Sequence, residues 1–376
     1  MTDASFEKPT LSRETLEQQN IFFDEDFYQD ADEEEDVGDG RISYYDLPQH
    51  VNTVRQALLN FEGRIPDCWS PHFDHDSLPA DYFQPPTPAI EKPDVEGITF
   101  ETCKDLMKQV EEKRTAWSEA DWVHFLRSRL FKSYEDAYPN RTKFNNLFDR
   151  WSSGQNICWE ELRERPHFDP YLTFPTAPKP DLTFGFPVID SSDRLPNGFA
   201  QETSVQNFSE KILSDLIGAG VIPTVTTGLR IKCNRGSRKM FDADNLCFPW
   251  AVFESKRSGL GSSGRERCYC QAANASSAAL TLLEGLFRKT YGQLPNDLGP
   301  IIAFTNTGAA FRVWLTFQTK YGKHMMVCIW ESSLDCIWGI LSTSIIIANM
   351  HIWASRVLKS RISACISEFR RKRHVG

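Results

Sequence analysis

Apolar residues recur at helical spacing through the first half of the chain. Val51, Val54 and Leu58 lie three to four residues apart, and a proline follows shortly after them. This spacing puts the apolar side chains on one face of a helix. The same period predicts helices over residues 47–61, 100–114 and 118–130, the last with Ser118 as its N-cap. We therefore expect a helical region with proline-rich loops over residues 46–160.

The second half has the pattern of an α/β domain. Residues 248–256 begin with an almost continuous apolar run, which is typical of a strand buried on both faces of a sheet. Because strands and helices alternate here, we expect an α/β domain over residues 161–368, with a sheet flanked by helices. Short apolar runs predict further strands at 181–188, 301–305, 309–318 and 325–330, and helical spacing predicts helices at 208–219 and 268–291.

Acidic residues are concentrated at the N-terminal end. The first 40 residues carry 14 Asp and Glu against Lys8 and Arg13, a net charge of −12, so the total of −9 leaves the remainder at +3. Acidic runs such as residues 32–36 are usually disordered, and we expect a disordered acidic tail over residues 1–45. A slightly basic body is compatible with a phosphate-rich partner such as nucleic acid.

Cysteine usage and the opening residues predict an intracellular protein. The ten cysteines are scattered without a CxxC pair, which favours reduced thiols over disulfides. Residues 1–13 are polar and acidic and lack the apolar core of a secretory signal. We expect a cytoplasmic or nuclear location.

One apolar segment is long enough to cross a bilayer. Residues 336–355 contain no Asp, Glu, Lys or Arg. Their polar residues favour a helix packed on the sheet over a membrane span, so no membrane partner is expected; these residues are Ser342, Thr343, Ser344, Asn349 and His351.

The strand over residues 248–256 ends in two ionisable residues. Side chains two residues apart point to the same side of a strand, so Glu254 and Lys256 are expected to face one site, and the Ser255 carbonyl could also reach a metal ion there. A carboxylate holds hard cations such as Mg²⁺, and a nearby lysine can position or activate an attacking water. Spacing alone also fits a structural Glu and Lys pair, because ExK occurs often by chance.

An ordered set of motifs adds weight to the catalytic interpretation. Lys179-Pro-Asp181 precedes one strand, Glu254-Ser-Lys256 ends another, and the next helix begins with residues 268–275 (CYCQAANA). Together with Trp117-Ser-Glu-Ala-Asp-Trp122, these motifs make the chain resemble a group of largely uncharacterised fungal proteins related to the PD-(D/E)XK nuclease-like superfamily.

The resemblance covers roughly residues 100–365 and implies a restriction-endonuclease-like mixed sheet. It also implies metal ligation by Asp181 and Glu254, with Mg²⁺ or Mn²⁺ as the cofactor. Lys256 would then be the catalytic cation, and Gln271 an orienting or phosphate-contacting group.

The first acidic ligand has two candidates. Asp181 precedes Glu254 by 73 positions, so an insertion containing the helix at 208–219 must intervene. Asp242 lies only 12 positions before Glu254 and is the competing metal ligand, with a turn residue that caps the strand entry as its alternative role. Asp181 is favoured because it lies at the start of a strand, directly after a proline. A helical acid such as Glu119 could complete the site, although its place in the first turn behind Ser118 favours a structural role.

Two further patterns bear on partners. Five cations without an acid lie in residues 230–239, and three arginines follow Lys256; clustered cations suit a phosphate backbone or an exposed loop. Residues 259–264 match GxGxxG, but no suitably placed acid follows, so a loop is favoured over a dinucleotide site. The basic run 370–373 suits a localisation signal or a solvated helix end.

Two functional hypotheses follow. The first is a metal-dependent phosphodiesterase acting on DNA or RNA, with Asp181, Glu254 and Lys256 at its centre. The second is a module with the same fold that lacks turnover and binds nucleic acid or a protein partner. The sequence alone does not decide between a protein partner and a homo-oligomer.

Overall fold

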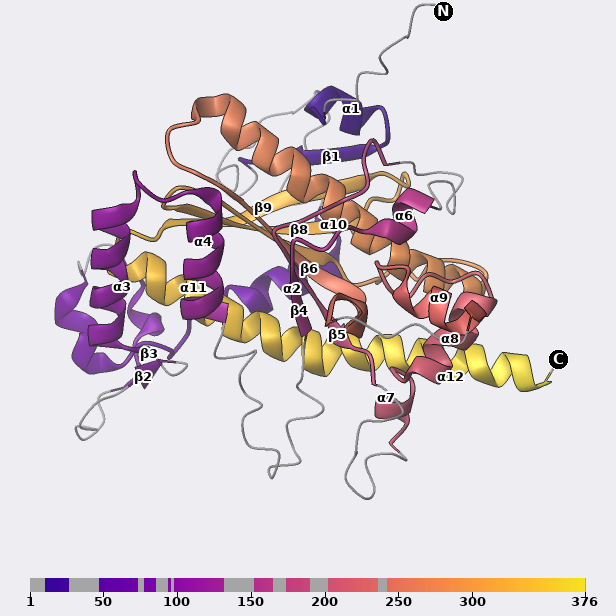
Figure 1. The fold of residues 1–376 in the computed structure, drawn as a ribbon. Coiled ribbons are helices and arrows are strands. Elements are labelled where there is room, and N and C mark those ends of the chain that lie inside the picture. Colours follow the sequence, from indigo (N-terminus) through magenta and orange to yellow (C-terminus); the bar gives the residue numbers. More distant parts are fainter. Residues whose placement is uncertain are drawn as a thin grey trace, which may run out of the picture.

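The computed structural model describes residues 11–26, 47–73, 78–85, 94–95, 98–131, 152–164, 174–189, 202–235 and 242–375. Its centre is a mixed sheet of seven strands in the order β1-β9-β8-β7-β6-β5-β4 (Figure 1). The strands are β1 (Ile21–Asp24), β4 (Ser152–Gln155), β5 (Leu182–Pro187), β6 (Leu246–Lys256), β7 (Ile301–Thr307), β8 (Ala310–Gln318) and β9 (His324–Ser333). A separate hairpin pairs β2 (Asp94–Val95) with β3 (Ile98–Thr99). The expectation of an α/β protein with a mixed sheet flanked by helices is confirmed.

The strands enter the sheet in two groups. β4, β5 and β6 are antiparallel neighbours, and β7 joins β6 in parallel after the long helix α10 (Gly261–Tyr291). β7, β8 and β9 form an antiparallel meander, and β1 adds to β9 in parallel. Every residue of β6 is buried, as its unbroken apolar pattern predicts for a strand with neighbours on both sides and helices on both faces.

Helices cover both faces of the sheet. α10 lies across one face, where its Tyr269 ring packs on Trp314 of β8 with centroids 4.8 Å apart. On the other face, Phe131 of η5 (Arg127–Phe131) packs on Phe184, Phe253 and Phe304. Small residues such as Ala272 and Ala275 are buried along α10, which lets this helix approach the strands closely.

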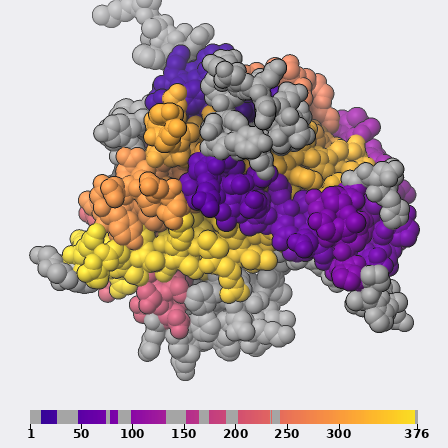
Figure 2. Space-filling view, turned by 180° about the vertical axis from the view of Figure 1, so that it is seen from behind, coloured from indigo at the N-terminus to yellow at the C-terminus, as the bar shows by residue number. Residues whose placement is uncertain are grey.

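The apolar C-terminal segment is part of the core. α11 (Ile337–Trp353), η9 (Ala354–Leu358) and α12 (Lys359–Val375) form one long helix, and α11 contacts β9 as well as α2 (Gln49–Leu58) and α3 (Phe100–Lys113). Figure 2 shows α2 and α3, in purple, beside the yellow C-terminal helix at the surface. By length and composition this helix could span a membrane, but 78% of its most apolar window is buried inside the protein. The expected packing of this segment on the sheet is confirmed.

The shorter helices complete the shell. α4 (Glu119–Leu126) begins at Ser118, whose side chain and that of Asp121 form a reciprocal capping box, as the N-cap prediction requires. The predicted insertion between β5 and β6 is also present. The remaining helices are α1 (Arg13–Glu17), η3 (Asp67–His72), η4 (Ala80–Tyr82), α6 (Glu160–Glu164), α7 (Thr203–Gln206), α8 (Glu210–Gly218), α9 (Gly228–Arg235) and η8 (Asp242–Asn245).

The structure corrects two expectations. The tail over 1–45 is not disordered throughout, because residues 11–26 form α1 and β1, which are held by pairing with β9 and by the burial of Leu16 and Ile21; the rest of that segment lies outside the described residues. One hydrophobic cluster contains residues from both sides of the 160/161 boundary, and the division into a helical region and an α/β domain stays a prediction. The glycine-rich segment 259–264 is a loop only up to residue 260, where α10 begins.

Candidate functional site

Strand register brings Asp181 opposite Glu254. Leu182 pairs with Phe253 in the antiparallel β5–β6 ladder, so the preceding residue, Asp181, lies across from Glu254. Directly opposed residues of an antiparallel pair share a face of the sheet. Because Phe253 packs on Phe131, alternation along β6 turns Glu254 toward the face covered by α10. The carboxylates predicted from sequence are therefore brought together.

Lys256 completes a charged cluster at the carboxyl end of β6. Its Nζ atom donates a hydrogen bond to the Ser255 carbonyl at 2.7 Å and lies 3.4 Å from the Glu119 carboxylate. Glu119 is fixed in the first turn of α4 by the cap at Ser118. The sequence favoured a structural role for Glu119, and the structure adds this residue to the cluster.

The two facing carboxyl groups differ in burial, and a backbone amide contacts one of them. Glu254 is 3% exposed, whereas Asp181 is only partly buried and its Oδ2 accepts a hydrogen bond from the Ser255 amide at 2.7 Å. Burial, reinforced by the neighbouring Asp181 charge, raises the pKa of Glu254 well above its usual value, against the opposing effect of Lys256. Burial also raises the pKa of Asp181, while the Ser255 amide and Lys256 oppose that rise.

α10 forms the wall over this cluster. The Cys268 thiol lies 3.5 Å from the Glu254 carbonyl oxygen, and the Asn274 amide donates to the Thr176 carbonyl at 3.0 Å, just upstream of Asp181. Gln271 lies between them, one turn after Cys268 on the same side of the helix. Its buried Oε1 atom has no hydrogen-bond partner among the described residues, and the same holds for the Ser255 hydroxyl.

Asp242 is not brought to this site. It begins η8, directly before β6, whereas Glu254 lies near the far end of that strand. At about 3.3 Å per residue, the distance from Leu246 to Glu254 along the strand is roughly 26 Å. Of the two acids that the sequence offered as partners for Glu254, the structure places Asp181 beside it and Asp242 at the opposite end of the strand.

Two of the basic residues highlighted by the sequence have local partners away from the site. Arg230 and Lys232 of α9 form ion pairs with Glu161 and Glu210, each at 2.6 Å. Thr224, four residues before α9, bridges to Cys247 at the beginning of β6, so α9 lies at the end of the strand remote from Lys256. Residues 236–241 lie outside the described residues, and the arginines near the site are the exposed Arg257, Arg265 and Arg267.

Residues of the C-terminal basic run donate hydrogen bonds to carbonyl groups at the carboxyl ends of other helices. Lys372 donates to the Thr290 carbonyl in the last turn of α10, and Arg373 donates to the Asp215 carbonyl near the end of α8. Cations at these positions complement the negative end of a helix dipole. At least these two basic residues therefore have a structural role.

The donor set fits a small, incomplete metal site. Two carboxylates face each other, and hard divalent cations take such oxygen ligands. The Ser255 carbonyl, expected as a further ligand, instead accepts the Lys256 hydrogen bond. Within the described residues, no group of three or more His, Cys, Asp or Glu side chains is arranged to hold a metal ion. Further ligands would have to come from solvent or a substrate.

Comparison with known proteins does not assign a family. Models of protein families, curated proteins and solved structures gave no significant match to this chain.

Proposed function

We propose that this protein is a metal-dependent phosphodiesterase with a restriction-endonuclease-like core of the PD-(D/E)XK type, acting on DNA or RNA. The observation that carries the proposal is the pairing of Asp181 with Glu254 beside Lys256 at one strand end. The resemblance requires an acid entering one strand, the ExK motif on a neighbouring strand, and a following helix that carries Gln271. Here β5, β6 and α10 supply these residues in that order.

The charge balance supports a cation at this position. Asp181, Glu254 and Glu119 surround a single lysine, and burial disfavours the ionised form of Glu254. Buried charges are normally paired or bound to metal ions, because an isolated buried charge is costly. An excess of acids over cations in a buried cluster is therefore the arrangement that a divalent cation would stabilise.

Each residue then has a chemical role. Asp181 and Glu254 would hold Mg²⁺ or Mn²⁺, which when bound lowers the pKa of water and stabilises charge on a phosphoryl oxygen. Lys256 would orient the attacking water or stabilise the negative charge that develops on the phosphate. The Gln271 amide oxygen, which has no hydrogen-bond partner among the described residues, would accept a hydrogen bond from that water or from a substrate hydroxyl group.

Calorimetry with Mn²⁺ on the full chain tests the metal site. We expect saturable binding that is lost in Glu254→Gln and retained in Glu266→Gln, a matched change at an exposed position of α10. Both variants should keep the melting profile of a folded protein. An equal affinity for Mn²⁺ in the parent protein and in Glu254→Gln would refute the assignment of Glu254 as a ligand.

Cleavage assays on the same samples test the catalytic step. We expect Mn²⁺-dependent hydrolysis of single- or double-stranded DNA or RNA, and its loss by about two orders of magnitude or more in Lys256→Ala. This variant should still bind Mn²⁺, because Lys256 does not ligate the metal. Activity at the parental level in a folded Lys256→Ala variant would contradict the catalytic role of the lysine.

A specific observation also favours the second candidate, a nucleic-acid or protein-binding module without turnover. Glu254 and Lys256 are only 3% and 6% exposed, and the Lys256 ammonium group donates a hydrogen bond to the Ser255 carbonyl. A site held shut in this way would bind its partner elsewhere on the surface. Nucleic-acid binding that is unchanged in Glu254→Gln, without Mn²⁺ affinity or cleavage in the parent, would support this alternative over the first.

A further inference from the structure

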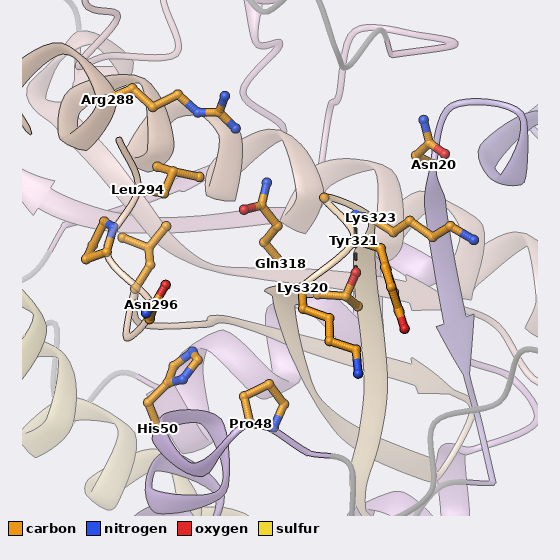
Figure 3. A pocket seen from close by; sticks show the side chains of 14 residues that line it. Asn20, Pro48, His50, Arg288, Leu294, Asn296, Gln318, Lys320, Tyr321 and Lys323 are labelled. Atoms are coloured by element: carbon orange, nitrogen blue, oxygen red, sulfur yellow. Dashed lines mark hydrogen bonds between the residues drawn. The ribbon is translucent and has the colours of Figure 1, made fainter. Parts of the chain in front are cut away.

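A pocket of about 860 Å³ lies at the opposite end of the sheet from Lys256. Its wall combines the turn between β8 and β9, the loop after α10, the first turn of α2, and Asn20 before β1 (Figure 3). Lys256 pairs with Thr307, which pairs with Ala310 at the beginning of β8, whereas the pocket residue Gln318 ends that strand. The pocket is therefore separate from the Asp181–Glu254 site.

The charge of this pocket is positive. Arg288, Lys320 and Lys323 line it, and no Asp or Glu of the described residues does so. Asp297 lies in the sequence between the lining residues Asn296 and Leu298, and it forms an ion pair with Arg361 at 2.8 Å. An acid that is already paired does little to offset the lining cations. Because Arg288 itself lies beside Glu284, the excess positive charge comes mainly from Lys320 and Lys323, and the pocket favours an anion.

Arg288 lies at the edge of a buried acid–base pair. Its guanidinium lies 3.6 Å from the carboxylate of Glu284, which is fully buried and also lies 3.2 Å from His324 Nε2. Figure 3 shows the Arg288 guanidinium and the Gln318 amide directed toward one another across the pocket. The Arg288 side chain is 36% exposed, so its guanidinium is accessible to a ligand in the pocket.

The two lysines are carried by a well-defined turn. The Gly322 amide donates to the Thr319 carbonyl at 2.9 Å, and the Lys323 amide donates to the Thr319 hydroxyl at 3.2 Å. Gly322 has a φ of +78°, which a residue with a side chain rarely adopts. The turn thus fixes the backbone of Lys320 and Lys323 at the mouth. The Lys323 side chain points away from Arg288 (Figure 3), with its Nζ atom 4.8 Å from the centre of the Phe22 ring, so Lys323 adds to the positive field rather than to direct contacts.

The amino-terminal turn of α2 adds to the positive field. Pro48 is the N-cap and forms no side-chain cap, so this end of the helix presents its partial positive charge toward the pocket. Burial lowers the pKa of His50 in the same turn, with Asp297 opposing the shift. The His50 ring is therefore neutral near pH 7 and able to donate or accept a hydrogen bond.

The remaining wall is apolar. Pro48, Leu294, Pro295 and Leu298 provide surface for a hydrophobic or ring-shaped group beside the cations. The volume lies within the range of about 300–1,000 Å³ that is common for small-molecule sites. We propose that this pocket binds a small organic anion, with a phosphate or carboxylate group in the positive field of Arg288 and Lys320 and an apolar body against the Pro48 and Leu298 side.

Calorimetry on the full chain in EDTA, at constant ionic strength, tests this proposal with AMP and inorganic phosphate as probes. We expect saturable AMP binding, and an affinity for phosphate about tenfold weaker, since phosphate cannot use the apolar wall. The double change Lys320→Glu and Lys323→Glu should weaken AMP binding at least tenfold. Lys289→Glu, beside Arg288 but outside the lining, and Glu254→Gln in the other site should leave it unchanged.

The lysines of the double variant are exposed, so the fold should survive both changes. An equal loss of affinity in Lys289→Glu would reveal general charge attraction and overturn the proposal. So would a failure of AMP to saturate at millimolar concentration, or AMP and phosphate binding with equal affinity. AMP binding abolished by Glu254→Gln would place the anion in the strand-end site instead, independently of whether that site cleaves a substrate.

Discussion

Two buried glutamates near the two ends of α10 have contrasting electrostatic surroundings. Glu284 is fully buried, and nitrogen atoms of His324 and Arg288 lie 3.2 and 3.6 Å from its oxygens. Glu254 is 3% exposed and faces Asp181, and the nearby cation Lys256 also contacts Glu119. The first cluster matches one acid with basic partners, whereas the second gathers three acids around one lysine.

The comparison separates a structural ion pair from a site that calls for a cation. A buried acid with matched partners is costly to disturb, because removing either partner leaves the other without compensation. A buried acid beside like charges is destabilised as it stands, as the raised pKa of Glu254 indicates. Functional sites commonly retain such unfavourable electrostatics, which is one reason why we propose the strand end as a site of chemistry.

The largest expected effect is at the matched cluster. Glu284→Ala should lower the free energy of unfolding by about 3 kcal/mol or more, since it leaves His324 buried without its acidic partner and opens a cavity. Urea denaturation with Glu266→Ala as the exposed control on α10 measures this loss. A change below about 1 kcal/mol would show that the Glu284 network is not structural.

At the unbalanced cluster the expected effect has the opposite sign. Glu254→Gln should raise the free energy of unfolding of the metal-free protein by about 1 kcal/mol, because it removes a buried charge opposite Asp181. Adding saturating Mn²⁺ should stabilise the parent protein alone, through binding to the folded state. Destabilisation by Glu254→Gln in EDTA would break the contrast between the two clusters.

The pH dependence of stability sharpens the same contrast. The pKa of Glu254 is raised in the folded state, so the folded protein keeps a proton that the unfolded chain releases above its ordinary pKa of 4.5. In EDTA, the free energy of unfolding should therefore fall as the pH rises from about 4.5 toward the raised pKa. Urea denaturation at several pH values should show this decline reduced in Glu254→Gln, with the two proteins converging at low pH.

The smallest effect is expected at the rim of the strand-end cluster. The Glu119 side chain is 44% exposed, and its contact with Lys256 measures 3.4 Å. Because an exposed ion pair is screened by solvent, Glu119→Gln should change the free energy of unfolding by about 0.5 kcal/mol or less. Thermal denaturation in EDTA measures it, and a loss of several kcal/mol would place Glu119 among the structural partners of Lys256.

Much of the secondary structure follows from local patterns in the sequence. The apolar run ending at Lys256 predicts the doubly buried strand β6, and the cap at Ser118 marks the beginning of α4. The segment over residues 21–24 is short, and pairing with β9 makes it a strand. The sequence pattern also did not predict that α10 begins at Gly261. Glycine and serine disfavour a helix locally, whereas packing against the sheet stabilises this first part of the helix.

For the candidate site, the sequence by itself determined which residues the proposed chemistry would use: the ExK motif placed Glu254 and Lys256 on one side of a strand, since side chains alternate with a period of two. Only the tertiary structure decided between Asp181 and Asp242, because the β5–β6 register puts Asp181 beside Glu254 and leaves Asp242 at the other strand end. It also decided that Glu119 joins the cluster and that Arg288 lines a separate pocket. Contacts between residues tens to hundreds of positions apart depend on strand order and helix packing, which no local pattern specifies.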